Sequence, residues 1–291
     1  MELAWQTDEC ASAFAAAAAV LRGRALVEPS VARALAEPVD GLRRVIELAG
    51  LSTEAFLSHL LPLASDRDSR LELVRVVLRK TLGPRHVASR ENEINAALVS
   101  VLQAFTRAVP RLEVELRLRE PPLRMQWEAR GPGLCTFVRR LVDERIFPER
   151  ARVELLYPVL GGGGESFMLY NTVHLEALLA HADEALPEVV RLGWLLSTLN
   201  LELPAYCQGL DRRRIELVGP LAMVPLVLFA AEQVELSRFD RSTVRLALQT
   251  WRIGSHDLDV LAENLHQWGA AFVDSQTTFH TALTALDRML A

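Results

Sequence analysis

The chain has 291 residues, of which 50% are hydrophobic and 24% are charged. This composition is typical of a folded globular protein and excludes the disordered, collagen-like and disulfide-rich classes. The 32 basic and 37 acidic residues give a net charge of −5, and the arginines are interleaved with acids. Nucleic-acid binders carry a concentrated basic surplus, so we expect no nucleic-acid partner. Lys80 is the only lysine, and this arginine bias indicates a bacterial source with a GC-rich genome.

Cysteine use and the N-terminal residues predict a cytoplasmic protein. Cys10, Cys135 and Cys207 are far apart and odd in number, which fits neither a disulfide framework nor a paired-cysteine metal site. An acidic start before the alanine-rich segment 15–19 argues against a secretory signal. The most apolar segment, 217–231, is shorter than the roughly 20 residues that a membrane crossing needs. We therefore predict a buried helix there and no membrane partner.

The first third of the chain predicts helices. Short helices are expected at 31–37, 40–49 and 54–61, separated by Pro38 and Gly50, because proline lacks the N–H of a continuing helix and glycine favours a helix end.

Two longer helices are expected next. The first covers 66–82, with Ser65 as its N-cap and Gly83 at its end. The second covers 90–108, and its apolar residues recur at steps of three and four, which places them on one face. These residues are Ile94, Leu98, Val101 and Phe105.

An alternating pattern then replaces the helical one. In 111–119 every second residue is apolar and the others are charged, and 123–130 repeats the alternation. A period of two places the apolar residues on one face of a strand. We predict two antiparallel strands joined across 120–122, with one charged, solvated face.

The remaining elements complete an α+β prediction. They are expected as helix 134–145, strands 152–160 and 166–175 around the glycine run 161–164, and helices 188–199, 214–234 and 242–251, of which 214–234 is expected to be broken by Pro220 and Pro225. The fold class is thus α+β, with a small, mostly antiparallel sheet of about four strands and a helical C-terminal third. Two regions are expected, a helical one at 1–110 and an α+β one at 111–291, with one continuous domain as the alternative.

The C-terminal segment 261–289 keeps a heptad register, which predicts one long helix. Its seam consists of Leu261, Leu265, Trp268, Phe272, Ser275, Phe279, Ala282, Leu286 and Met289. Two interpretations stay open: the helix packs on its own domain, or it binds a protein partner or a second copy of the chain.

The glycine run offers the first candidate chemistry. Glycine loops bind phosphate when their N–H groups converge at a helix N-terminus, but here a strand is predicted to follow, so a hairpin turn is favoured. Ser166 is a weak candidate nucleophile, because the second glycine of a GxSxG elbow is missing. The nearby polar residues Glu165, Asn171 and His174 form the first cluster to inspect for an enzyme or ligand site.

Cys135 is the thiol with the best catalytic case. It is expected near the start of helix 134–145, where the helix dipole would favour a thiolate, whereas burial among apolar neighbours would raise its pKa. No metal is expected, because His174 and His181 are spaced too widely for one ion on a helix or a strand. No cofactor is predicted either.

The expected order of strands, an edge-like strand and then helix 188–199 is similar to the layout of zinc-dependent metallopeptidases. In that family the helix carries HExxH, whose histidines hold zinc while the glutamate activates water. This chain has neither histidine at 188–194. The resemblance in element order therefore transfers no functional residue.

The leading functional prediction is a non-catalytic protein that works by binding another protein or itself. The alternatives are an enzyme or small-ligand binder, or a degenerate zinc-peptidase-like scaffold without the metal motif.

Overall fold

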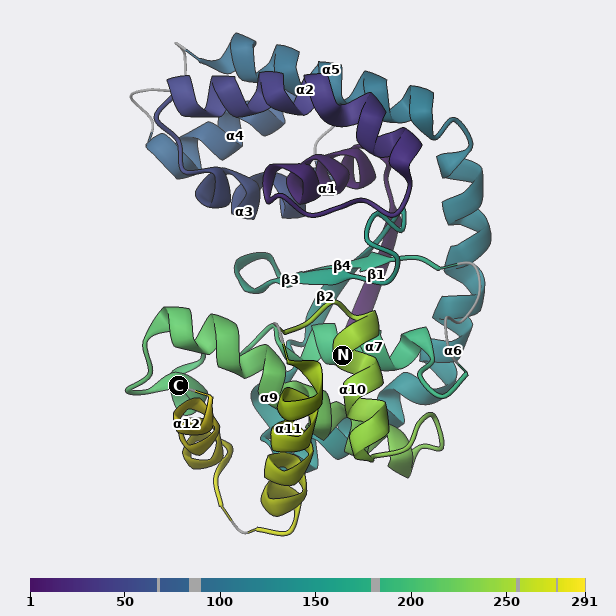
Figure 1. Ribbon diagram of the computed structural model, residues 1–291, viewed down its shortest axis with the longest axis vertical. Helices are drawn as coiled ribbons and strands as arrows, with labels where there is room; N and C mark the ends of the chain where they lie inside the picture. The colour runs from purple at the N-terminus through teal and green to yellow at the C-terminus, as the bar shows by residue number, and fades with distance from the viewer. Residues whose placement is uncertain (67–68, 84–89, 179–183, 255–256, 276, 291) are drawn as a thin grey trace. The chain divides into compact units, whose positions relative to one another are not determined.

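The computed structural model describes residues 1–66, 69–83, 90–178, 184–254, 257–275 and 277–290. The predicted α+β class is confirmed: helices form the N-terminal region and the C-terminal third, together with one four-stranded mixed sheet (Figure 1). In chain order the elements are β1 (Glu2–Thr7), α1 (Glu9–Leu21), α2 (Pro29–Leu48), α3 (Thr53–Leu63), α4 (Arg70–Leu82), α5 (Glu91–Ala108), α6 (Leu112–Leu141), η2 (Glu144–Ile146), β2 (Arg150–Leu156), β3 (Gly164–Phe167), η3 (Met168–Tyr170), β4 (Thr172–Glu176), α7 (Glu188–Ser197), α8 (Pro204–Cys207), α9 (Arg212–Gln233), α10 (Arg241–Thr250), α11 (Leu258–Val273) and α12 (Phe279–Met289).

The chain forms two compact units. The larger unit contains Met1–Ala4, Pro121–Val153 and Gly162–Ala291, and the smaller unit contains Trp5–Glu120 and Glu154–Gly161.

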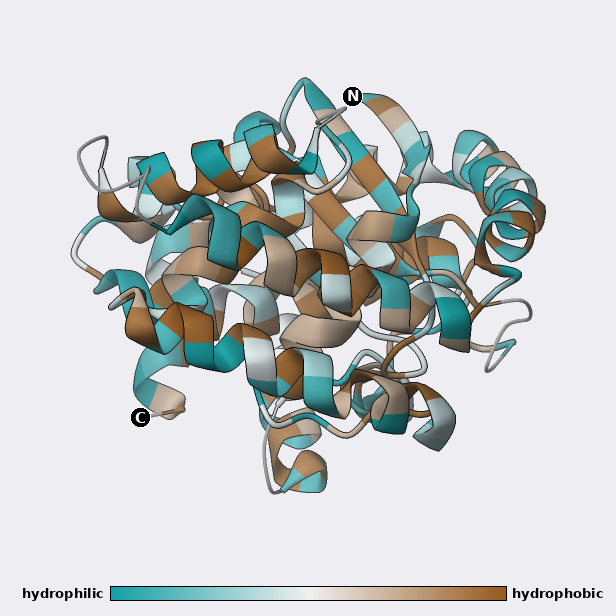
Figure 2. Ribbon diagram, turned by 90° about the horizontal axis from the view of Figure 1, so that it is seen from above, coloured by the Kyte–Doolittle hydropathy of each residue, from teal (hydrophilic) through white to brown (hydrophobic). Residues whose placement is uncertain are grey.

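Helices α1 to α5 build the core of the smaller unit. α2 packs along α5, and α1 packs against α2, α3 and α5. The predicted apolar face of α5 is confirmed, since its four apolar residues at 94, 98, 101 and 105 are fully buried. Burial of each such side chain contributes about 1.5–3 kcal/mol. Figure 2 shows brown hydrophobic and teal hydrophilic bands on the same helices of the chain.

Only the C-terminal end of α4 agrees with the prediction. Gly83 caps its C-terminus with a φ of 78°, a left-handed value that suits glycine. The helix begins at Arg70 with Ser69 as the N-cap, not after Ser65. Residues 67 and 68 of the predicted first turn lie outside the described residues.

Prolines interrupt the helices less than predicted. The expected break at Pro38 is wrong, because α2 runs through it, and α9 runs through Pro220 and Pro225. An internal proline costs about 3 kcal/mol of helix stability. In α2 the burial of an apolar face offsets that cost. Its members are Val31, Leu35, Val39, Leu42 and Ile46.

The predicted strand pair at 111–130 is wrong, because α6 covers this whole segment. Leu112 and Leu116 are buried, whereas Val114 and Leu118 are 58% and 66% exposed. Burial at i and i+4, with the intervening apolar residues exposed, is the helical pattern.

Charge pairing in the same segment also follows helical spacing. Glu113 pairs with Arg117, and Arg124 pairs with Glu128, each four residues apart. Such pairs contribute about 0.2–0.5 kcal/mol to a helix. The predicted helix at 134–145 is the C-terminal part of α6, which ends at Leu141.

The sheet has the strand order β1-β2-β4-β3, which leaves β3 at one edge. β2 overlaps the strand expected at 152–160 but begins at Arg150 and ends at Leu156. The single strand expected at 166–175 is a hairpin, in which β3 and β4 pair antiparallel across η3. β1 was not predicted at all. The predicted number of four strands is right, although two of the predicted strands, at 111–119 and 123–130, belong to α6.

Helices α7 and α9 to α12 form most of the larger unit, with α9 at its centre. Within the described residues, α9 is the one helix long and apolar enough to cross a membrane, and 72% of its apolar window is buried, as in the core helix of a soluble protein. The predicted buried helix at 217–231 is therefore confirmed.

The heptad segment is two helices, α11 and α12, and not one long helix. Phe272 and Phe279 lie on the two sides of the break and are 6% and 3% exposed. Trp268 donates its indole N–H to the Ala282 carbonyl (2.9 Å) and stacks on Phe272. The seam is thus largely buried inside the chain's own larger unit.

Candidate functional site

The glycine loop between β2 and β3 has a backbone that only glycine tolerates. Gly162 has a φ of 135°, and a Cβ at this residue would lie 2.8 Å from the Thr250 carbonyl oxygen. Both the backbone angle and the contact exclude side chains here. A Cβ on Gly164, the first residue of β3, would collide with Leu195 of α7. The loop and the strand are therefore closely packed on their neighbours.

The loop binds an anion that the protein itself supplies. The carboxylate of Glu176, at the end of β4, accepts the N–H groups of Gly162 (2.8 Å) and Gly163 (3.0 Å). Adjacent glycine N–H groups converge on one oxygen in this way in anion-binding loops. Glu176 therefore occupies both donors. The hairpin turn that the sequence favoured at this run is wrong, because β2 and β3, which the loop connects, are separated by β4 in the sheet.

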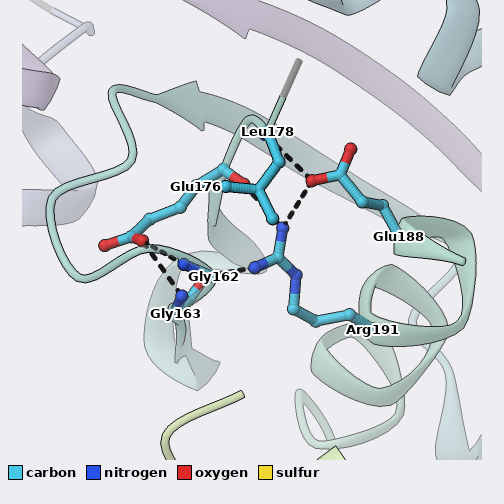
Figure 3. Close-up of polar contacts among 6 residues, drawn as sticks. All are labelled: Gly162, Gly163, Glu176, Leu178, Glu188 and Arg191. Carbon is cyan, nitrogen blue, oxygen red and sulfur yellow. Dashed lines mark hydrogen bonds and ion pairs between the residues drawn. The ribbon is translucent and has the colours of Figure 1, made fainter. Parts of the chain in front are cut away.

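Arg191 of α7 connects this loop to the helix (Figure 3). Its side chain is 2% exposed. The guanidinium donates to the Gly163 carbonyl (3.2 Å), to the Glu176 carbonyl and to the Glu188 carboxylate (2.9 Å). Burial lowers the pKa of Arg191, and the negative charges of Glu188 and Glu176 act in the opposite direction.

Glu188 extends the cluster to the chain that follows β4. Its Oε1 accepts the backbone N–H of Leu178 (2.9 Å) as well as the Arg191 guanidinium. The Nε of Arg191 is buried and has no hydrogen-bond acceptor within the residues that the structure describes. One guanidinium and two carboxylates thus fasten α7 to the loop and to β4. Charges this deeply buried and bonded hold a geometry in place.

The predicted catalytic residues of the hairpin lie on different faces of it. Ser166 donates its hydroxyl to the Leu195 carbonyl (2.9 Å), so it points toward α7. Glu165 and His174 are paired in the β3–β4 register, and alternation along a strand places them on the opposite face. His174 is 2% exposed, and its ring contacts Phe167 at 4.7 Å between centroids. Ser166 and His174 therefore do not form a nucleophile–base pair in this structure.

Asn171 lies at the tip of the hairpin. It has a left-handed φ of 46° and accepts the Arg152 N–H with its carbonyl. It is exposed, whereas His174 is buried. The polar residues that the sequence grouped as a possible site are thus spread from the tip to the interior.

Cys135 lies deep within α6 and not at a helix start. The helix dipole therefore does not favour a thiolate at Cys135 as predicted, because the dipole acts only within the first and last turns of a helix. Cys135 is 3% exposed, and burial raises its pKa to about 12. A neutral, buried thiol of this kind is inert.

The structure also bears on metal binding. His181, one of the two histidines compared in the sequence, lies outside the described residues. Among the residues that are described, no group of three or more histidine, cysteine, aspartate or glutamate side chains is placed to hold an ion.

Sequence reasoning missed Arg191 as the centre of the cluster. Its spacing of three residues from Glu188 permits an ion pair on a helix. Exposed helices commonly carry pairs with the same spacing, so the spacing does not reveal that this pair is buried. Only the packing of α7 on β3 and β4 buries the pair.

The expected edge-like strand directly before helix 188–199 is wrong, because β4, the strand that precedes α7 along the chain, lies between β2 and β3 in the sheet. Comparison with protein-family models, with curated proteins and with solved structures found no match to this chain.

Proposed function

We propose that this protein is a non-catalytic binding protein that takes an extended segment of a partner protein along the edge of β3. The position of β3 at the end of the sheet order supports this. An edge strand presents backbone donors and acceptors on which another chain forms a further strand.

The register identifies the backbone groups that are available. The Glu176 N–H donates to the Gly163 carbonyl (3.3 Å), which is one of the two bonds of a hydrogen-bonded pair, while the Gly163 N–H donates to the Glu176 carboxylate. Such pairs alternate along an antiparallel ladder, so the N–H and C=O groups of Gly164 and Ser166 point away from β4. No hydrogen bond to these outward groups is present in the described part of the chain. This outward row is the observation that carries the proposal.

The edge is held rigid before any partner arrives. The Ser166 hydroxyl fixes the middle of β3 to α7, and the Arg191 cluster fixes the loop that precedes the strand. A preordered edge loses little conformational entropy on binding, which favours affinity.

An exposed apolar side chain follows the strand. Leu169, in η3, is 70% exposed. A segment that continues past the end of β3 can cover this side chain, and burial of a leucine contributes about 1.5–3 kcal/mol relative to exposure.

Binding of linear peptides to the full-length chain tests the proposal. Peptides enriched from a random library on the wild type are expected to lose binding to Ser166→Pro, because proline removes one outward N–H. Proline is tolerated on an edge strand where the N–H is not used in the sheet. Circular dichroism and the melting temperature check that the variant is folded.

Ser166→Ala is the matched control. It removes the hydroxyl bond to Leu195 and keeps the backbone N–H, so it is expected to retain peptide binding. Peptides that bind the folded Ser166→Pro variant as tightly as the wild type would overturn the proposal.

The state of the cysteines supports a cellular location for the protein. The three cysteines are free in the structure, which supports a reducing compartment. Together with the arginine bias, this leads us to propose a bacterial cytoplasm.

A further inference from the structure

One face of β3 lies very close to α7. A Cβ at Gly164 would lie 2.6 Å from Cδ1 of Leu195, and the Ser166 hydroxyl donates to the Leu195 backbone carbonyl (2.9 Å). Side chains on one face of a strand recur at every second residue, so both positions face the helix. β3 therefore carries its two smallest residues where α7 approaches it.

α7 also extends toward the space beside the free edge. It packs on β3 and β4, the two strands nearest that edge. A helix with its side chains is about 10–12 Å across, whereas neighbouring strands lie about 4.8 Å apart. A helix over two strands therefore also covers part of a third strand added beside β3. Val189–Ser197 are all buried, so the outer flank of α7 is already covered and leaves no open groove for large side chains.

We infer that the partner segment carries glycine, alanine or serine at the two positions opposite Gly164 and Ser166. The inference rests on the proposed function and adds the chemical class of the partner. A strand paired with β3 continues the pleat of the sheet, so the residues directly opposite Gly164 and Ser166 also point to the face of α7. Alternate side chains of the added strand set specificity in this binding mode. The partner segment thus has small residues at two positions separated by one residue.

β3 itself has this spacing of small residues, but a second copy of the chain is a poor occupant of the edge. Antiparallel pairing of two β3 strands around a two-fold axis keeps the same face of both sheets on one side. The two α7 helices would then lie side by side. Because each α7 is already buried within its own chain, the residues that cover the helices would collide before the strands could pair. A single extended segment brings no such helix.

Selection of random linear peptides on the full-length chain tests the inference. The wild type is expected to enrich peptides with glycine, alanine or serine at two positions separated by one residue. Leucine at either position of an enriched peptide should weaken the Kd about tenfold, because overpacking a closed site commonly costs that much. Leucine at the intervening position is the control and should change the Kd little, since that side chain points to the opposite face.

A variant that creates space gives a second measurement. Leu195→Ala removes the methyl groups nearest Gly164. It is expected to restore part of the affinity for the peptide with leucine opposite Gly164, while circular dichroism and the melting temperature check folding. A folded variant that discriminates as strongly as the wild type would overturn the role of Leu195. If Leu195→Ala does not fold, the leucine peptides on the wild type decide alone.

Other outcomes separate the two proposals. Peptides that bind the wild type, fail on Ser166→Pro and accept leucine at all three positions would overturn the small-residue partner and leave the edge in place. Peptides that bind folded Ser166→Pro unchanged, or no enrichment at all, would overturn both. A dimer of the wild type that Ser166→Pro dissociates would replace the partner segment by a second copy.

Discussion

At the scale of single residues, Glu176 does more for the glycine loop than the glycines alone. Gly162 and Gly163 can adopt the turn, but their N–H groups would be buried without acceptors if the carboxylate were absent. The backbone carbonyl of Glu176 accepts from Arg191 as well. One residue thus supplies acceptors to both sides of the cluster.

We expect Glu176→Ala to lower the free energy of unfolding by about 1–3 kcal/mol for each of the two buried glycine N–H groups that it leaves without an acceptor. Glu176→Gln keeps an acceptor for the glycines and should lose less. Urea denaturation followed by circular dichroism measures both. Glu113→Ala is the control, because it breaks an exposed pair with Arg117 and should cost about 0–1 kcal/mol. Equal costs for the two alanine variants would contradict the cluster's structural role.

Cys135 gives a prediction about pH. With its pKa raised to about 12 by burial, the thiol is expected not to react with a disulfide reagent at pH 8 in the native protein and to react on unfolding. The partly exposed Cys207 should react first. Mass spectrometry of the modified peptides assigns the sites, and rapid native labelling of Cys135 would show that it is accessible.

The same thiol affects stability at alkaline pH. In the unfolded chain it ionises near its ordinary value of 9.0, while the folded chain retains the proton to about pH 12. The unfolded state therefore binds fewer protons in this range, and Cys135 lowers stability as the pH rises from about 9 to 12. The unfolding free energy of the wild type, relative to that of Cys135→Ala, should therefore decrease as the pH rises from about 9 to 12.

At the scale of elements, α6 shows where sequence patterns mislead. The alternation of leucine with arginine and glutamate fits a strand, yet all three residue types are strong helix formers, and the charges also pair at four-residue spacing. The buried and exposed leucines are distinguished only by what packs on the helix.

Two leucines in α6 test this directly. Leu116 is 1% exposed and Leu118 is 66% exposed. We expect Leu116→Ala to cost about 2–5 kcal/mol and Leu118→Ala to change stability by less than about 0.5 kcal/mol, as measured by denaturant unfolding. A strand would place both on one buried face, so similar costs would contradict the helix.

Elements with one consistent signal were predictable. α5 has a single apolar face, α4 ends in a glycine, and α9 is apolar and buried. The glycine run of the candidate site was also visible. The role of Arg191 was not, because the burial of an arginine depends on contacts between α7 and strands far from it in sequence.

At the scale of the whole molecule, the question is whether the C-terminal heptad belongs to the core or to an interface. The aromatic residues on both sides of the α11–α12 turn contact one another: Phe279 packs on Phe272 and on Tyr206. Arg214 of α9 also binds Asp287 of α12 (2.6 Å). These contacts tie α12 to the rest of the larger unit.

We therefore expect Phe279→Asp to unfold or strongly destabilise the protein, since it buries an unpaired charge in an apolar site. Met289 occupies the same seam and is 50% exposed, so Met289→Asp should leave the fold intact and serves as the matched control. Thermal melting reports stability, and light scattering after size exclusion reports mass. A folded Phe279→Asp monomer obtained from a wild-type oligomer would instead show that the seam joins chains. If the wild type is a monomer and Phe279→Asp is unfolded, the seam belongs to the core of the chain. Any partner would then have to bind elsewhere, as proposed for the edge of β3.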